Sequence, residues 1–145
     1  MDAATPARAH WETFPHGADI GVRGCGPTRE AAFAMAATAL TALVTDPRRV
    51  RSRRAVELTA EGGDDETLLV AFLDAVIFEL SAHDLLLSRY AVSIAGPKLT
   101  ARALGETVDV ARHRPAVEPK GATYTELRVA QTGDGGWVAQ CVIDV

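Results

Sequence analysis

Two stretches of the chain carry apolar residues at the spacing of an α-helix. The first follows Thr28, a suitable N-cap, and ends before Pro47, because proline disfavours the helical conformation in the residue that precedes it. The second follows the break at Gly62-Gly63 and begins at Asp64 or Asp65. Its apolar stripe is wide enough for a principal core element and comprises Leu68, Leu69, Phe72, Leu73, Val76, Ile77 and Leu80.

Most of the remaining chain alternates apolar and polar residues with the period of two that is typical of β-strands. Strands are predicted around residues 11–14, 20–25, 54–61, 90–94, 99–103, 123–131 and 137–145. Turns join the first pair at His16-Gly17 and the last pair at the glycine-rich residues 133–136. Residues 106–119 hold two prolines and two charged clusters, so a loop or a short irregular helix is expected there.

The order of these elements is two strands, a helix, a strand, a second helix and four strands. Consecutive hairpins after two helices predict an α+β fold, in which two helices pack on a mainly antiparallel or mixed β-sheet. At 145 residues and 15.4 kDa, the chain is expected to form a single domain over residues 10–145, preceded by a disordered N-terminal tail at residues 1–9.

The composition is that of an ordinary globular protein and narrows the function by exclusion. Fifteen Lys and Arg against nineteen Asp and Glu give a net charge of −4, which argues against a protein whose main task is to coat nucleic acid. Two cysteines are too few for a disulfide scaffold or a four-cysteine zinc site. Every apolar run is shorter than the roughly 18 residues of a membrane span, and the first residues lack the apolar core of a signal peptide. A cytoplasmic location is therefore expected.

The last predicted strand combines apolar rows with an acidic end. Its alternate residues lie on opposite faces. The face expected in the core carries Trp137, Ala139, Cys141, Ile143 and Val145. The other face carries Val138, Gln140, Val142 and Asp144. The sequence ends at Val145, so its terminal carboxylate is expected one residue from the Asp144 side chain. Two negative groups this close repel each other unless water solvates them or a cation bridges them.

A third carboxylate from another strand would make a credible cation site here. Calcium and magnesium bind several oxygen ligands, carboxylates included. Asp19 is a candidate because it starts a predicted strand beside the His16-Gly17 bend. On spacing alone, solvated surface acids are the simpler interpretation of these residues, and the pattern leaves both explanations open.

Six motifs occur in an order and at a spacing that resemble one known family. They are His16-Gly17-Ala18-Asp19-Ile20-Gly21-Val22-Arg23-Gly24, Glu30-Ala31-Ala32-Phe33, Thr45-Asp46-Pro47, His113-x-Pro115, Lys120-Gly121-Ala122-Thr123-Tyr124 and Trp137-Val138-Ala139-Gln140-Cys141-Val142-Ile143-Asp144-Val145. The motifs lie between His16 and Val145, and the resemblance as a whole covers the chain from Trp11 to Val145. In these motifs the sequence resembles the archease family, small accessory proteins of the RtcB-type tRNA-splicing ligase.

The resemblance implies a site, a partner and a function. It implies that Asp19, Asp144 and Val145 hold a divalent metal ion, with calcium as the expected ion. It implies a non-enzymatic cofactor that promotes transfer of GMP to the active-site histidine of an RtcB-type RNA ligase, and so sustains multiple turnover in tRNA splicing or RNA repair. RNA would be contacted indirectly, through the ligase, and the oligomeric state is left open.

Two residues depart from the family pattern. Gly17 stands where the family usually has threonine, which removes a hydroxyl that can cap or orient the loop around Asp19. Thr125 stands where a histidine commonly follows the Thr-Tyr pair, so any role of that imidazole is in doubt in this chain. Neither departure changes an expected metal ligand.

The histidines and cysteines give weaker signals. His16 is expected to be a polar loop residue and His113 to have a structural role in the Pro115 turn. Cys25 lies between two glycines, and nothing near it in the sequence indicates an activated thiolate. Cys141, on the core face of its strand, is expected to be inert.

Two other functions are compatible with the sequence. The acidic cluster is also compatible with a catalytic metal that activates water in a small hydrolase, but no general base or substrate-phosphate clamp is apparent, which makes this the weaker interpretation. An RNA-binding or chaperone module can use the arginines of one short run to grip phosphates. This run comprises Arg48, Arg49, Arg51, Arg53 and Arg54. No aromatic residue interleaves these arginines to stack bases, so a solvated loop is the simpler interpretation.

Overall fold

The computed structural model describes residues 8–145, so most of the predicted disordered tail at residues 1–9 lies outside the described residues. The elements are, in chain order, β1 (His10–His16), β2 (Asp19–Gly26), α1 (Arg29–Val44), the 3-10 helix η1 (Pro47–Arg49), β3 (Arg54–Glu61), α2 (Asp65–His83), β4 (Leu85–Ala95), β5 (Lys98–Thr107), α3 (Val110–His113), β6 (Gly121–Ala122), β7 (Arg128–Gln131) and β8 (Trp137–Asp144). No helix within residues 8–145 is long and apolar enough to cross a membrane.

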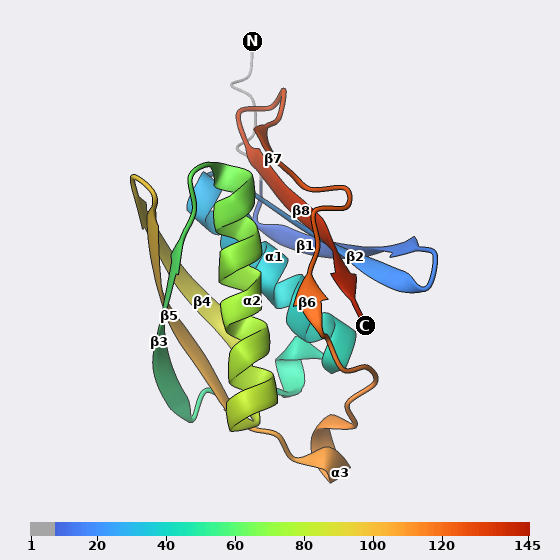
Figure 1. Cartoon of the computed structure of the whole chain (residues 1–145). Helices are drawn as coiled ribbons and strands as arrows, with labels where there is room; N and C mark the ends of the chain where they lie inside the picture. The colour runs from blue at the N-terminus through green and yellow to red at the C-terminus, as the bar shows by residue number, and fades with distance from the viewer. Residues whose placement is uncertain (1–7) are drawn as a thin grey trace.

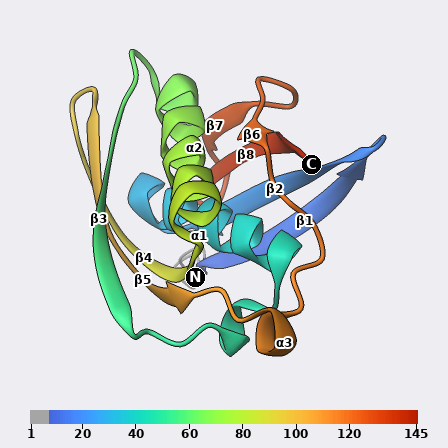
Figure 2. The ribbon, with the colours of Figure 1, turned by 60° about the horizontal axis from the view of Figure 1, so that its bottom comes forward.

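The strands form two antiparallel sheets with α1 and α2 between them (Figures 1 and 2). In the five-stranded sheet the order is β1-β2-β8, and β6 and β7 both pair with the free edge of β8. The other sheet has the order β3-β5-β4. One hydrophobic cluster draws its buried side chains from both sheets and both long helices. The sheets are therefore joined by a shared core.

Helix α1 lies directly against β2 because the strand offers no side chain at the contact. A Cβ atom on Gly24 would stand 2.1 Å from the carbonyl oxygen of Ala32 and 2.2 Å from the amide nitrogen of Ala36. The helix is rich in alanine, and most of its residues are buried. Thr28 begins it as predicted, since its hydroxyl accepts a hydrogen bond from the Ala31 amide at 3.0 Å.

Helix α2 also begins where its sequence predicts. The Asp64 carboxylate accepts a hydrogen bond from the Thr67 amide at 2.8 Å and forms a capping box with that residue. Its apolar stripe faces the core, where the Phe72 ring stacks on Phe33 with 6.3 Å between ring centroids and meets Tyr90 edge-on at 6.1 Å. This aromatic cluster ties α2 to α1 and to the three-stranded sheet.

The predicted α+β class is confirmed, and the structure refines it in three places. The strands divide into two sheets instead of one, and β4 begins at Leu85, well before the predicted residue 90. Residues 123–131 do not form one strand, because a loop separates β6 from β7. The expected loop at 106–119 contains a single helical turn, α3, as the sequence allowed.

Both faces of β8 are buried, including most of the row opposite the predicted core row. Val138, Gln140 and Val142 are each less than a tenth exposed, and only Asp144 in that row is open to solvent. The loop between β6 and β7 helps to cover this second face, since the Glu126 carbonyl accepts a hydrogen bond from the Gln140 side-chain amide at 3.1 Å.

Candidate functional site

The position of Asp19 follows from the tight turn between β1 and β2. Gly17 and Ala18 form a two-residue loop, and Gly17 adopts a φ of +60°, the pattern of a type II′ hairpin turn. Asp19 is then the first residue of β2 and lies opposite His16 on β1. The glycine that departs from the family pattern thus supplies the left-handed conformation that this turn uses.

The antiparallel register of β2 and β8 carries Asp144 to Asp19. Ile20 lies opposite Ile143, so the next pair along the two strands is Asp19 and Asp144. The backbone amide of Val145 also donates a hydrogen bond to Asp19 Oδ1 at 3.3 Å. The structure therefore brings together the three residues expected from the sequence, and metal binding by them stays a prediction.

The acidic site lies open at the edge of the molecule, beside the C-terminus in Figure 1. Asp144 is exposed, whereas Asp19 and Val145 are half-buried. Carboxylate oxygens are the donors that calcium and magnesium prefer, so this donor set fits a hard divalent cation. Calcium takes six to eight oxygen ligands, so three residues that each bind through one oxygen leave positions for water or for groups of a partner.

A short segment holds the C-terminal strand in place beside this site. The backbone amide of Lys120 donates to the Asp144 carbonyl at 2.8 Å, and Thr123 donates to the Val142 carbonyl through both its amide and its hydroxyl, at 3.0 and 2.8 Å. Thr125 accepts a hydrogen bond from the Val142 amide through its carbonyl at 3.0 Å. The same segment exposes 68% of Tyr124. The backbone of the 120–125 segment thus anchors it, including at Thr125, where the family commonly has histidine.

His113 belongs to a second polar cluster, around α3. It is 2% exposed, and its Nδ1 accepts a hydrogen bond from the Asp109 amide at 2.8 Å. Its Nε2 therefore carries the hydrogen and donates to Glu106 Oε2 at 3.0 Å. This arrangement agrees with the structural role that the sequence suggested for His113.

Glu106 is the buried centre of that cluster, and its importance was not visible in the sequence. It accepts hydrogen bonds from Arg112 Nη2 at 2.6 Å and from the Arg51 amide at 2.8 Å, in addition to His113. The Arg112 guanidinium is the main cause that lowers the pKa of Glu106 to about 2. Glu106 therefore stays ionised at neutral pH and fixes β5, α3 and the segment before β3 to one another.

Some arginines of the run at residues 48–54 take part in the Glu106 network, and others lie outside it. Arg48 pairs with the Asp46 carboxylate at 2.9 Å, and Arg53 lies 3.9 Å from Glu106. Arg51, Arg53 and Arg54 line one shallow depression together with Arg112. The run lies beside α3, since Arg112 Nη1 donates a hydrogen bond to the Arg49 carbonyl at 2.7 Å, and α3 lies at the bottom of Figure 1, away from the C-terminus. Its arginines therefore do not contribute to the acidic site.

The profile of the Archease protein family (MTH1598/TM1083) matches residues 11–145. The chain belongs to the archease family. Protein archease of Thermococcus gammatolerans is 38% identical to this archease over 139 residues, which cover 93% of this chain and 98% of that relative. Protein archease of Pyrococcus abyssi is 36% identical over the same shares of the two chains.

Solved structures agree with this assignment. The solution structure of Methanobacterium thermoautotrophicum protein 1598 aligns with a TM-score of 0.76 and 30% identity, over 93% of this archease and 98% of that chain. The crystal structure of a Thermotoga maritima protein, described as "an archease, possible chaperone", aligns with a TM-score of 0.59 over 92% of this chain and 96% of that one. At 16% identity, this second likeness concerns the fold alone.

Proposed function

We propose that this archease is a non-enzymatic accessory factor that activates an RtcB-type RNA ligase, and that it acts through Asp19, Asp144 and Val145. The single observation that carries the proposal is the register of β2 and β8, which sets Asp19 opposite Asp144 with the Val145 amide on the Asp19 carboxylate. Family membership supports the accessory role.

Activation of this kind is a binding function. An accessory protein changes the population of a ligase state only by binding that state more tightly than the other states. Here the favoured state is the one that accepts GMP on its active-site histidine. The archease therefore has to bind the guanylylation-competent state of the ligase more tightly than the other states, and its site has to fit that state.

The acidic site offers such a contact if a divalent cation occupies it. Asp19, Asp144 and the carboxylate of Val145 would hold the cation, which would offset their mutual repulsion and present open coordination positions to oxygen atoms of the ligase or its nucleotide. The 120–125 segment flanks the site with the exposed ring of Tyr124. Tyrosine is enriched in protein interfaces, so Tyr124 is a candidate contact for the ligase.

The test is multiple-turnover RNA ligation with the ligase limiting and with GTP and divalent metal supplied. Wild-type archease should carry the product past several equivalents per ligase, whereas Asp144→Asn and Asp19→Asn proteins should leave it near one. Glu57→Gln is the matched control, because Glu57 is an exposed carboxylate on the other sheet. Time courses that superimpose with and without archease, over a range of its concentrations, would remove the proposal.

The same proteins separate the two rival functions. Hydrolysis of GTP by the archease alone, abolished in Asp19→Ala, would indicate a metal-dependent hydrolase instead. Steeply salt-dependent RNA binding without any ligase, weakened by substitution of Arg51 and Arg54, would indicate an RNA-binding module. The accessory role predicts neither result.

A further inference from the structure

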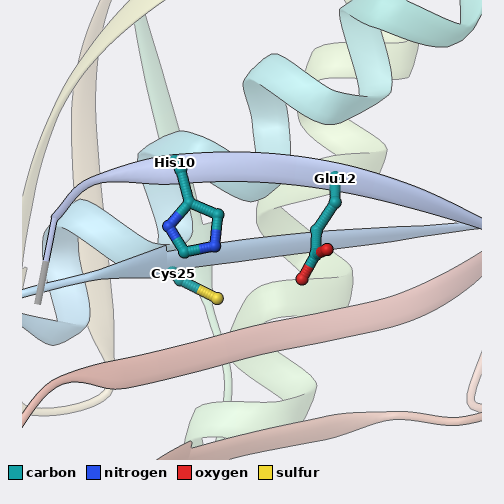
Figure 3. Close-up of side chains that lie close together, drawn as sticks. All are labelled: His10, Glu12 and Cys25. Atoms are coloured by element: carbon teal, nitrogen blue, oxygen red, sulfur yellow. The ribbon is translucent and has the colours of Figure 1, made fainter. Parts of the chain in front are cut away.

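Three side chains of different chemistry meet on the β1–β2 hairpin, at the end away from its turn (Figure 3). They are an imidazole, a carboxylate and a thiol, contributed by His10, Glu12 and Cys25. One potential ligand atom from each residue lies within 4.8 Å of the other two. Imidazole nitrogen, carboxylate oxygen and thiolate sulfur are the ligands of zinc sites in proteins.

The backbone dictates this meeting. His10 and Glu12 occupy alternate positions of β1, so their side chains share one face of the strand. His10 lies directly opposite Cys25 on β2, and Glu12 lies opposite the neighbouring Arg23. Directly opposite residues in an antiparallel pair have their Cβ atoms about 5 Å apart. The cluster is thus a consequence of the hairpin register set by Gly17-Ala18.

One nitrogen of the His10 ring is held by a backbone hydrogen bond, and the other is turned toward the cluster. Its Nδ1 lies 3.0 Å from the Arg8 carbonyl, and because a carbonyl only accepts, Nδ1 carries the hydrogen. The lone pair of the neutral ring then resides on Nε2. In Figure 3 one ring nitrogen points toward the thiol and the carboxylate, and the other points away from them. Metal-binding histidines commonly donate their second ring N–H to a backbone carbonyl in this way.

Glu12 keeps an oxygen for a further partner. Its Oε1 is 3.3 Å from Arg23 Nη1, and both side chains are partly exposed. Arg23 has contacts of its own, since its Nε donates to Gln140 Oε1 at 2.8 Å and its guanidinium lies 4.6 Å from the centre of the Phe14 ring. The arginine therefore stays in place when Glu12 Oε2 turns to another ligand.

Cys25 is a free, half-buried thiol at the floor of the cluster. Burial, with a smaller contribution from Glu12, raises the pKa of this thiol. It is therefore protonated at neutral pH and is not a reactive thiolate. A cation bound by a cysteine displaces that proton, so a protonated thiol in the metal-free protein is compatible with ligation.

We propose that His10, Glu12 and Cys25 form a binding site for a borderline divalent transition-metal ion of the zinc class. Three protein ligands leave a fourth tetrahedral position for water or for a ligand from a partner. The nitrogen, oxygen and sulfur donors distinguish this site from the all-oxygen set of Asp19 and Asp144, which suits calcium or magnesium. The two sites lie at opposite ends of β2, so they can be tested separately.

The test is a titration of the untagged full chain with Zn²⁺ against a chromophoric chelator, paired with Co²⁺ spectroscopy. One Zn²⁺ per chain should bind, and Co²⁺ should give a thiolate-to-metal charge-transfer band with tetrahedral ligand-field bands. Replacement of even an outer-shell partner of a metal site costs 10–100-fold in affinity. His10→Ala and Cys25→Ser should therefore each weaken Zn²⁺ binding at least about tenfold, Glu12→Gln should weaken it as well, and Cys25→Ser should abolish the charge-transfer band.

Two further variants make the test decisive. His16→Ala removes an exposed histidine of the same strand next to the acidic site, and Asp144→Asn removes a carboxylate of that site. Both proteins should bind Zn²⁺ like the wild type, with circular dichroism showing that all variants are folded. Absence of Zn²⁺ binding, or binding lost in Asp144→Asn and kept in His10→Ala and Glu12→Gln, would overturn the proposal. Either result leaves the ligase assay unaffected, so the two proposals fail independently.

Discussion

At the scale of single residues, Glu106 shows how one buried charge organises an end of the molecule. Its side chain is 6% exposed and accepts hydrogen bonds from the Arg112 guanidinium, the Arg51 amide and the His113 ring. A buried carboxylate is costly unless it is paired and hydrogen-bonded, and the partners of Glu106, which lies on β5, come from α3 and the segment before β3. The network therefore holds α3 against β5 and the segment before β3 at this end of the molecule.

Glu106→Gln should remove the part of the pH dependence of the unfolding free energy that comes from ionisation of this carboxylate. The folded pKa of about 2 is below the ordinary 4.5, so the stabilisation is complete above about pH 4.5 and is lost as the pH falls toward 2. We expect the variant to be less stable by about 1–3 kcal/mol at neutral pH, with a gap that narrows in acid. Urea denaturation over a pH series measures this, with Glu57→Gln as the exposed control. A gap of constant size from about pH 6 to about pH 3 would contradict the role given to Glu106.

Gly17 is the residue that sets the turn before Asp19. Restoring the family's usual residue with Gly17→Thr would place a β-branched side chain at a φ of +60°. A left-handed conformation costs such residues about 1–2 kcal/mol, and Gly17→Asn should cost less because asparagine tolerates this region. Urea denaturation of the two variants should rank them in that order below the wild type. Equal stability of Gly17→Thr and the wild type would show that the turn does not need the left-handed glycine.

At the scale of elements, the close packing of α1 on β2 supports the sheet that carries both candidate sites. Gly24→Ala would force a methyl group to 2.1 Å from the Ala32 carbonyl oxygen, and backbone atoms of a helix cannot yield without moving the helix. Overpacking of this kind costs about 1–3 kcal/mol, or more where the backbone is displaced. Gly133→Ala is the matched control, because nothing lies within 4 Å of its added methyl group. Similar melting temperatures for the two variants would contradict the packing described for α1.

The elements predicted well are those whose signals are local. Thr28 and Asp64 cap the two helices as their positions in the sequence indicate. The start of β4 was missed because residues 85–88 are buried on both faces, so the chain shows no alternation there. The division into two sheets depends on contacts between distant elements and has no local signal.

The candidate sites follow the same rule. The place of Asp144 beside the terminal carboxylate and that of Asp19 at the start of a predicted strand indicate both residues, and the family motifs include both, but only the β2–β8 register shows that they are neighbours. His10 and Glu12 stand at alternate positions of a strand, yet the sequence does not indicate that Cys25 lies opposite His10. The sequence predicts a loop at Glu106, because burial of a single carboxylate leaves no pattern in the sequence.

At the scale of the whole molecule, both candidate sites lie on the outer side of the five-stranded sheet, at the two ends of β2. The inner side is occupied by α1 and the shared core (Figure 2). Ligands can therefore bind to the outer face of the sheet without disturbing the packing of the helices on its inner face.

We expect Asp144→Asn to leave the unfolding free energy within about 0.5 kcal/mol of the wild type, since it alters an exposed surface residue. Urea denaturation checks this, and a larger loss would mean that Asp144 serves the fold.

The proposed function requires the acidic end of this archease to promote guanylylation of an RtcB-type ligase. This can be measured as the rate at which the ligase becomes covalently labelled with GMP from labelled GTP, with wild-type or Asp144→Asn archease present. We expect rapid labelling with the wild-type protein and the slow unassisted rate with the variant. Equal acceleration by both proteins would show that the acidic end does not act on guanylylation.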